Sequence, residues 1–332
     1  MAEQADPWLD AVKDAIKQTI AERSGPIVAI AEEHLANSGK FIRPHLISKV
    51  VEAAGGTRDE AIEWAAAIEL LHNATLIHDD YQDGDTHRRG EPTVWVKHGG
   101  PQAINAGDYL WSAAFHIAAR RTHSPDITLA LIRLLSEMAM EVVDGQAEEL
   151  SPLTAGTATR EHYLKIIRGK TSGLFRTPAR GALLIAGATP NQVERLSAHF
   201  EELGLLFQLQ DDLLDLYGDK GRTHRGEDLR EGKLSFLIVK YLELFPDSVD
   251  SCVEFLKRDR ESVTPEEADA WISLFRSNGT LSSALDEFRD KEQKIVQGIA
   301  SEFPDYRPLF NELISMVKSP IEHLFVVADT KG

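Results

Sequence analysis

Apolar residues recur along most of the chain at the three- and four-residue spacing of helices that bury one face. No stretch shows the sustained apolar and polar alternation of a β-strand. The pattern predicts helices over about 6–23, 26–36, 44–54, 58–83, 101–121, 125–150, 159–187, 190–218 and 232–243, with four more as far as about 325. We therefore expect an all-α protein of about ten or more helices that forms a single domain over residues 1–332.

The composition is that of an ordinary globular protein, with 42% hydrophobic and 27% charged residues. The one cysteine, Cys252, excludes a disulfide framework and fits a reducing compartment. The N-terminus is acidic and amphipathic, and no apolar run approaches the roughly 20 residues that cross a bilayer. We expect a cytoplasmic protein with no transmembrane segment. The net charge of −17 argues against nucleic acid and anionic membranes as partners.

An acidic cluster ends the apolar run over 58–83. Asp79 and Asp83 lie about 40° apart around a helix, so their carboxylates project to the same side and, with Asp80, repel one another unless a cation lies between them. Hard oxygen ligands suit Mg²⁺, which shares its coordination shell with phosphates. Arg88 and Arg89 follow within one short loop, and guanidinium groups match phosphate oxygens bidentately. The alternative is an acidic helix end that leads into a charged loop.

A second acidic cluster repeats the spacing of the first, 132 residues later (211 minus 79). Asp211, Asp212 and Asp215 end the apolar run over 190–218, and Gln208 lies one turn earlier on the same face. Two such clusters that face each other would hold divalent ions between two helices. The pair therefore predicts a site for a diphosphate.

A basic segment precedes the helix predicted over 44–54. Lys40 and Arg43 lie in the segment GKFIRP, and Pro44 is expected at the first position of the helix. The unpaired N–H groups and the positive end of the helix dipole favour an anion there. A solvated basic loop is the alternative.

Two further segments carry candidates of a less specific kind. His72 precedes Asp79 by two turns on one face and could donate to a second phosphate, although a packed core histidine is the alternative. The aromatic residues Tyr109, Trp111 and Phe115 form a stripe that we expect to belong to the core. Its other possible use is to line an apolar tunnel.

Glycines surround a lysine in the middle of the helix predicted over 159–187. Gly169 and Gly173 flank Lys170, and each costs the helix about 1 kcal/mol relative to Ala, so we expect a close approach of another segment there. Gly145, in the preceding helix, also indicates close packing. Lys170 and Lys233 are candidate diphosphate ligands, and surface lysines are the alternative.

These motifs, GKFIRP, HDDYQDGDTHRRGEPT, GKT and FQLQDDLLD, resemble in kind and order those of the trans-isoprenyl diphosphate synthases, the polyprenyl synthetase family. The resemblance extends from about Gly39 to Lys233. It implies an all-α fold around a central cavity, usually in a homodimer. It also implies use of Mg²⁺, about three ions per active site with Mn²⁺ as an alternative, to ionise an allylic diphosphate and join it head-to-tail to isopentenyl diphosphate.

The resemblance also implies a role for each matching residue. The metal ions would be bound by Asp79, Asp83 and Asp211, with Asp80, Asp212 and Asp215 in support. The allylic diphosphate would be held by Arg88, Lys170 and Lys233, and isopentenyl diphosphate by Lys40, Arg43, His72 and Arg89. Thr171 and Gln208 would lie beside the developing allylic cation.

The chain departs from the family pattern in the loop between Asp215 and Asp228. The loop is one residue shorter and lacks the usual lysine, which leaves Arg222, His224 and Arg225 as candidates to contact the leaving diphosphate, with His224 closest in register.

The residues one turn before Asp79 would face the growing product. They are Ala74 and Thr75, where short-chain members of the family often carry a bulky aromatic. The same face continues to Trp64, so that residue, or an aromatic from the 101–121 helix, could close the passage. We expect a product of geranylgeranyl length or longer. The alternatives are a farnesyl diphosphate synthase, a class I terpene cyclase and a non-catalytic synthase subunit.

Overall fold

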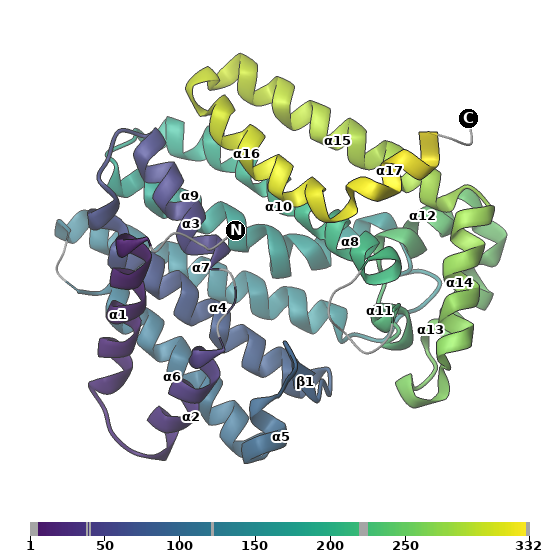
Figure 1. The fold of residues 1–332 in the computed structure, drawn as a ribbon, viewed down its shortest axis with the longest axis horizontal. Coiled ribbons are helices and arrows are strands. Elements are labelled where there is room, and N and C mark those ends of the chain that lie inside the picture. Colours follow the sequence, from purple (N-terminus) through teal and green to yellow (C-terminus); the bar gives the residue numbers. More distant parts are fainter. Residues whose placement is uncertain (1–5, 38, 40, 121–122, 219–224, 330–332) are drawn as a thin grey trace. The chain divides into compact units, whose positions relative to one another are not determined.

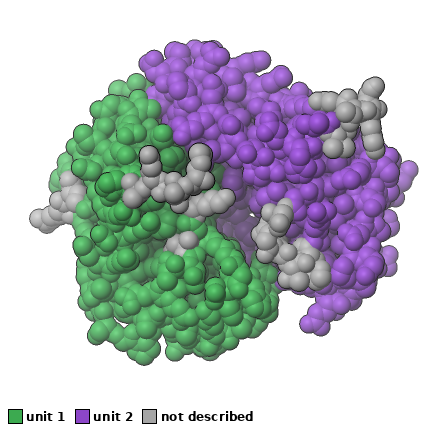
Figure 2. Space-filling view, viewed as in Figure 1, with its two compact units in different colours: residues 1–140, 174–200 green, residues 141–173, 201–332 purple. Residues whose placement is uncertain are grey.

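A computed structural model describes residues 6–37, 39, 41–120, 123–218 and 225–329 (Figure 1). Lys40, Arg222 and His224 lie outside this part of the chain. The described residues are almost entirely helical, and their only strands are two residues long, so the all-α prediction is confirmed. The chain forms two compact units, which Figure 2 colours separately: unit 1 is residues 1–140 and 174–200, and unit 2 is residues 141–173 and 201–332. That the whole chain is one domain stays a prediction.

Unit 1 takes its helices from the first half of the chain and from one later segment. They are α1 (Pro7–Ala21), α2 (Pro26–Ala36), α3 (Ile42–Ala53), α4 (Ile62–Gln82), α5 (Val94–His98), α6 (Gly100–Ala118), the first part of α7 (Pro125–Glu149), α9 (Gly173–Ile185) and the first part of α10 (Pro190–Tyr217). A hairpin of β1 (His87–Arg88) and β2 (Glu91–Pro92) follows α4. The short α5 was not predicted.

The helix α4 is the core of unit 1 because it is apolar on every side. Trp64, Ile68 and Leu71 are at most 1% exposed. The indole N–H of Trp64 donates to the carbonyl of Pro178 at 3.0 Å. A Cβ at Gly181 would lie 2.1 Å from Cε2 of the same ring, so only glycine lets α9 approach α4 this closely.

The helix α6 packs along α4. Its buried face consists of small residues such as Ala106 and Ala114, because small side chains let two helix axes come close. Tyr109, Trp111 and Phe115 lie beside this face and are half-exposed. The prediction that this aromatic stripe belongs to the core is therefore wrong.

Unit 2 takes its helices mainly from the second half of the chain. They are the end of α7, α8 (Arg160–Ile167), the end of α10, α11 (Glu227–Arg230), α12 (Phe236–Leu244), α13 (Val249–Leu256), α14 (Pro265–Ser277), α15 (Thr280–Glu302), α16 (Arg307–Lys318) and α17 (Glu322–Asp329). The prediction of four helices after 243 is one too few, because a 3₁₀ turn at Ser319–Ile321 separates α16 from α17.

The helix predicted over 159–187 is interrupted by a π-helical turn, Arg168–Ser172, between α8 and α9. A Cβ at Gly169 would lie 2.7 Å from the carbonyl oxygen of Glu141, and a Cβ at Gly145 would lie 2.7 Å from the backbone nitrogen of Lys170. The close approach expected from these glycines is therefore present, between the end of α7 and the π turn. Such turns are frequent at functional sites.

No helix in the part of the chain that the structure describes is long and apolar enough to cross a membrane.

Candidate active site

The C-terminal end of α4 carries the first acidic cluster. The helix ends at Gln82, and the N–H of Asp83 still donates to the carbonyl of Asp79 at 2.8 Å. Asp80 is 2% exposed and accepts from Nε and Nη2 of Arg88 at 2.7 and 2.6 Å. Burial raises the pKa of Asp80, and the neighbouring guanidinium opposes that shift. The buried Asp80 carboxylate therefore holds the guanidinium of Arg88 in one orientation.

The hairpin after α4 turns at Arg89 and Gly90, whose φ values of 54° and 83° are both left-handed. Arginine in this conformation costs about 1 kcal/mol, which points to a required position for its side chain. Nη1 of Arg89 donates to the carbonyl of Asn37 at 2.8 Å. A Cβ at Gly39 would lie 2.3 Å from Nη2 of Arg89, so the guanidinium lies directly against the glycine of GKFIRP.

Arg43 and His72 lie in the same cluster of cations as Arg89. Burial lowers the pKa of Arg43 to about 10, and Arg89 adds to the shift. Burial also holds the pKa of His72 well below its usual value, with Arg43, Arg88 and Arg89 as further causes. Among the described residues, neither Nε of Arg43 nor Nδ1 of His72 has a hydrogen-bond partner. Buried polar atoms without a partner cost about 1–3 kcal/mol each, and an anionic ligand would satisfy them.

Two residues beside this cluster were not singled out from the sequence. Glu69 is 3% exposed, and Oε1 accepts from Nδ2 of Asn73 at 3.1 Å. Burial raises the pKa of Glu69, while Arg43 opposes the shift. A charged residue within the otherwise apolar segment 64–71 was the available signal, since a buried acid needs a cation close by. The buried Glu69 carboxylate is therefore partly compensated by the positive charge of Arg43.

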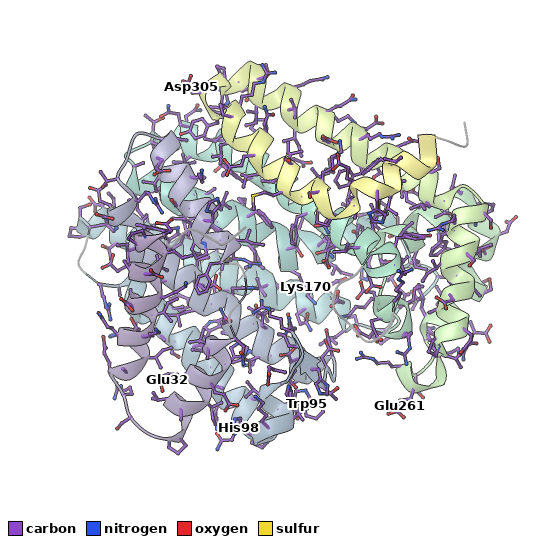
Figure 3. The ribbon with its side chains drawn as sticks, viewed as in Figure 1. Glu32, Trp95, His98, Lys170, Glu261 and Asp305 are labelled. Atoms are coloured by element: carbon purple, nitrogen blue, oxygen red, sulfur yellow. The ribbon has the colours of Figure 1, made fainter. Side chains whose placement is uncertain are left out.

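The basic segment departs from its prediction in one respect. α3 begins at Ile42, so Pro44 is its third residue and Arg43 lies in its first turn. The helix has no side-chain cap at Phe41, so the N-terminal N–H groups lack that partner. A small pocket of unit 1 is lined by residues of α2, the hairpin and α5, among them His34, Asn37, Arg88, Arg89 and His98, of which Figure 3 labels His98.

In unit 2 a chain of hydrogen bonds joins α8, α10 and the π turn. The hydroxyl of Thr171 donates to Oε1 of Gln208 at 2.7 Å. Nε2 of Gln208 donates to Oδ1 of Asp212 at 2.7 Å. Oδ2 of Asp212 accepts from the hydroxyl of Tyr163 at 2.9 Å and from the N–H of Phe236 at 2.6 Å. Burial raises the pKa of Asp212 to about 7, and Asp228 adds to the shift.

The two candidate lysines, Lys170 and Lys233, both lie in unit 2 and are paired with glutamates. Lys170, labelled in Figure 3, donates to Glu149, and both side chains are 18% exposed. Nζ of Lys233 lies 2.7 Å from Oε2 of Glu231. An anionic ligand of either lysine would compete with a carboxylate already in place. These glutamates had no sequence signal beyond their charge.

The structure brings some predicted residues together within each unit. Unit 1 gathers Arg43, His72, Arg88, Arg89 and Asp80. Unit 2 gathers Thr171, Gln208, Asp212 and, on the same helix, Asp211 and Asp215, the last of which accepts from the N–H of Asp228 at 3.3 Å. Arg225 is exposed, and the choice among Arg222, His224 and Arg225 stays open.

Comparisons with known proteins show the family to which the chain belongs. The polyprenyl synthetase family model matches residues 26–270. The chain is 36% identical over 233 residues to a short chain isoprenyl diphosphate synthase of Methanothermobacter thermautotrophicus, which covers 69% of this chain and 71% of the relative. It is 38% identical over 235 residues to a (2E,6E)-farnesyl diphosphate synthase of Mycobacterium tuberculosis, which covers 70% of this chain and 63% of the relative.

Solved structures show the same similarity. A crystal structure of a geranylgeranyl pyrophosphate synthase matches with a TM-score of 0.85 and 27% identity, over 94% of this chain and 97% of that one. A polyprenyl synthase from Caulobacter crescentus, complexed with calcium and isoprenyl diphosphate, matches with a TM-score of 0.80 and 27% identity, over 94% of both chains.

Proposed function

Because the chain belongs to the polyprenyl synthetase family and is a trans-prenyltransferase, we propose that it condenses isopentenyl diphosphate head-to-tail with an allylic diphosphate. The primer is dimethylallyl, geranyl or farnesyl diphosphate, and the product is an all-trans diphosphate of geranylgeranyl length or longer. The single observation that carries the assignment of substrates is the cation cluster of unit 1. There Arg43 and His72 bury polar atoms that have no partner among the described residues and that an anionic ligand would satisfy.

Mg²⁺ fits the donor set of the acidic clusters. Burial is the main cause that raises the pKa values of Asp80 and Asp212, and the charges of Asp83 and Asp211, respectively, add to the shifts. Each cluster therefore gathers mutually repelling carboxylates of the kind that bind hard cations. We assign Asp79, Asp83 and Asp211 as ligands, with Asp80, Asp212 and Asp215 in support. Asp80 pairs with Arg88, and both oxygens of Asp212 accept hydrogen bonds. When bound, Mg²⁺ would neutralise the charge that develops on the departing diphosphate. The calcium and isoprenyl diphosphate of the Caulobacter crescentus relative support this assignment.

The side chains of this protein then bind and orient the two substrates. Arg88, Lys170 and Lys233 hold the allylic diphosphate, and Lys40, Arg43, His72 and Arg89 hold isopentenyl diphosphate. Lys170 exchanges Glu149 for the diphosphate when the primer binds. Since the hydroxyl hydrogen of Thr171 is committed to Gln208, the oxygen lone pairs remain to face the allylic cation. The apolar surroundings exclude water, which would otherwise quench the cation.

Product length is proposed to depend on α4. Thr75 is 5% exposed and Ala74 is fully buried. Both side chains are small, so we propose that the growing product passes this side of α4, where a larger residue would block it. Trp64 is held in place by Pro178 and Gly181, which supports a role as the end of that space. Thr75→Phe is expected to shorten the product. Leu76→Phe, at a partly exposed position about 100° away around the helix, is the control and should leave product length unchanged.

We propose a homodimer located in the cytoplasm. Ile104 on α6 and Leu129 and Met140 on α7 are 45%, 48% and 59% exposed, and large apolar side chains of this kind commonly become buried between subunits. Sedimentation of the full chain tests the dimer. The single cysteine fits the reducing environment of the cytoplasm, and the acidic net charge is compatible with this location.

The function is tested by incubating the full chain with isopentenyl diphosphate, Mg²⁺ and one primer at a time, with product length read by chromatography. We expect elongation beyond farnesyl diphosphate, and loss of turnover with EDTA that Mg²⁺ or Mn²⁺ restores. No isopentenyl-dependent elongation with any primer would contradict the function. Farnesyl diphosphate as the sole product would keep prenyl transfer but overturn the proposed length, and the similarity to the Mycobacterium tuberculosis farnesyl synthase makes this the second candidate.

A further inference from the structure

Given the prenyl transfer proposed above, we propose that Tyr163 is a positioning residue for the reaction. It acts through Asp212 and Gln208 to fix the direction of the Thr171 hydroxyl beside the allylic cation. Tyr163 lies outside every motif that the sequence indicated, and its hydroxyl is one of the three donors that hold the Asp212 carboxylate.

The first step is the state of Asp212, which is 3% exposed. Its Oδ2 accepts from Tyr163 and from the backbone of Phe236, and its Oδ1 accepts from Gln208. Hydrogen bonds at both oxygens prevent rotation of the carboxylate plane. Asp212 is thus a fixed acceptor.

The second step is the orientation of Gln208. A carboxylate only accepts hydrogen bonds, so the amide NH₂ of Gln208 must face Asp212, and Oε1 must face Thr171. The hydroxyl of Thr171 then has to donate. The direction of each hydrogen bond from Asp212 through Gln208 to Thr171 therefore follows from the fixed carboxylate of Asp212.

The third step is the way Tyr163 is held. It is 3% exposed, its ring stacks on Phe236 with centroids 6.4 Å apart, and it lies on α8 immediately before the π turn. Thr171 belongs to that same π turn. The continuous segment from Tyr163 to Thr171 is therefore fastened to α10 at both ends, once at Asp212 and once at Gln208. Loss of the tyrosine hydroxyl removes one of these two fastenings.

The test is Tyr163→Phe, which removes only the hydroxyl and keeps the ring. We expect kcat to fall about tenfold, as for the loss of one hydrogen bond to a charged group, with KM for both substrates unchanged. Tyr217→Phe is the matched control. Tyr217 is also buried, lies on α10 and donates to the carbonyl of Ile272 at 3.0 Å, outside the chain to Thr171. We expect its kcat to equal that of the wild type.

Non-additivity separates positioning from a general structural role. If Tyr163 acts through Thr171, then Tyr163→Phe should lower kcat little further in a Thr171→Val background. Multiplication of the two single effects would overturn the proposal. So would a fall in kcat for Tyr217→Phe as large as that for Tyr163→Phe.

A readout that needs no turnover separates this inference from the proposed function. The side-chain amide of Gln208 can be followed by NMR in the ¹⁵N-labelled full chain. We expect slow hydrogen exchange of this amide in the wild type and in Tyr217→Phe, and exchange at least tenfold faster in Tyr163→Phe. Equal exchange in all three proteins would overturn the role of Tyr163. A wild type that exchanges as expected but performs no prenyl transfer would refute the proposed function instead.

Discussion

The two units present their polar residues in opposite states. In unit 1, Arg43 and His72 bury polar atoms that have no partner among the described residues. In unit 2, the chain from Tyr163 through Asp212 to Thr171 supplies its own partners at every step. The first state resembles a binding site before its ligand arrives, and the second resembles a rigid support.

This difference predicts how the stability and activity of each unit respond to ligand binding and to substitutions. Unpaired buried donors lower stability until a ligand binds, so stability in unit 1 should depend strongly on ligand. A completed network is already rigid, so its loss should lower stability and rate without affecting binding. Variants in the two units should therefore separate binding from support.

The largest expected effect concerns the acidic cluster of α4. We expect Asp79→Asn to lower kcat/KM about 10³-fold, because it removes a ligand of the metal that neutralises developing charge. Steady-state assays with isopentenyl diphosphate measure it. Asp108→Asn is the control, since that side chain is 69% exposed on α6 and should leave kcat/KM unchanged. Equal kcat/KM values for Asp79→Asn and Asp108→Asn would show that Asp79 is not a metal ligand.

Arg43→Met tests the idea that unit 1 waits for an anion. We expect KM for isopentenyl diphosphate to rise about 100-fold with little change in kcat, because a charge-assisted contact is lost. The rise in Tm that isopentenyl diphosphate causes in the wild type should disappear. Arg120→Met removes a guanidinium that pairs with Glu22, and it serves as the control. An unchanged KM would show that the cluster binds something else.

Tyr163→Phe should give the opposite result in unit 2. We expect the free energy of unfolding in denaturant to fall by about 1–2 kcal/mol, since Asp212 loses a buried donor. The affinity for both diphosphates, measured calorimetrically with Mg²⁺, should stay the same. If Tyr163→Phe lost diphosphate affinity and kept its stability, the hydrogen bonds of unit 2 would serve binding rather than structural support.

The smallest expected effect is the pH dependence of His72. Its folded pKa lies well below 6.5, because of burial first and nearby cations second. Below pH 6.5 the unfolded chain binds a proton that the folded state does not, so wild-type stability falls as pH falls from 6.5 toward the folded pKa. We expect His72→Gln to gain about 1 kcal/mol relative to the wild type over the first pH unit of that window, in denaturant titrations. A relative stability that does not change with pH would place a proton acceptor beside His72.

Particular residues show how far the sequence could be interpreted. The spacing of Asp79 and Asp83 predicted a helix end with two carboxylates, and α4 ends there. The glycines at 145 and 169 predicted a close approach, although not that they face each other. The aromatic stripe of α6 was misassigned, because periodicity identifies one face of a helix but not which neighbour covers it.

The sequence by itself determined most of the helices, the order of the motifs and the family, since each depends on residues a few positions apart. Only the tertiary structure decided three contacts. Arg89 lies against Gly39, the charge of Arg43 acts on the buried Glu69, and Tyr163 donates to Asp212 across 49 residues of sequence. The physical reason is that these contacts join segments far apart in the chain. No local spacing encodes such a partner, and burial decides which polar groups must find one.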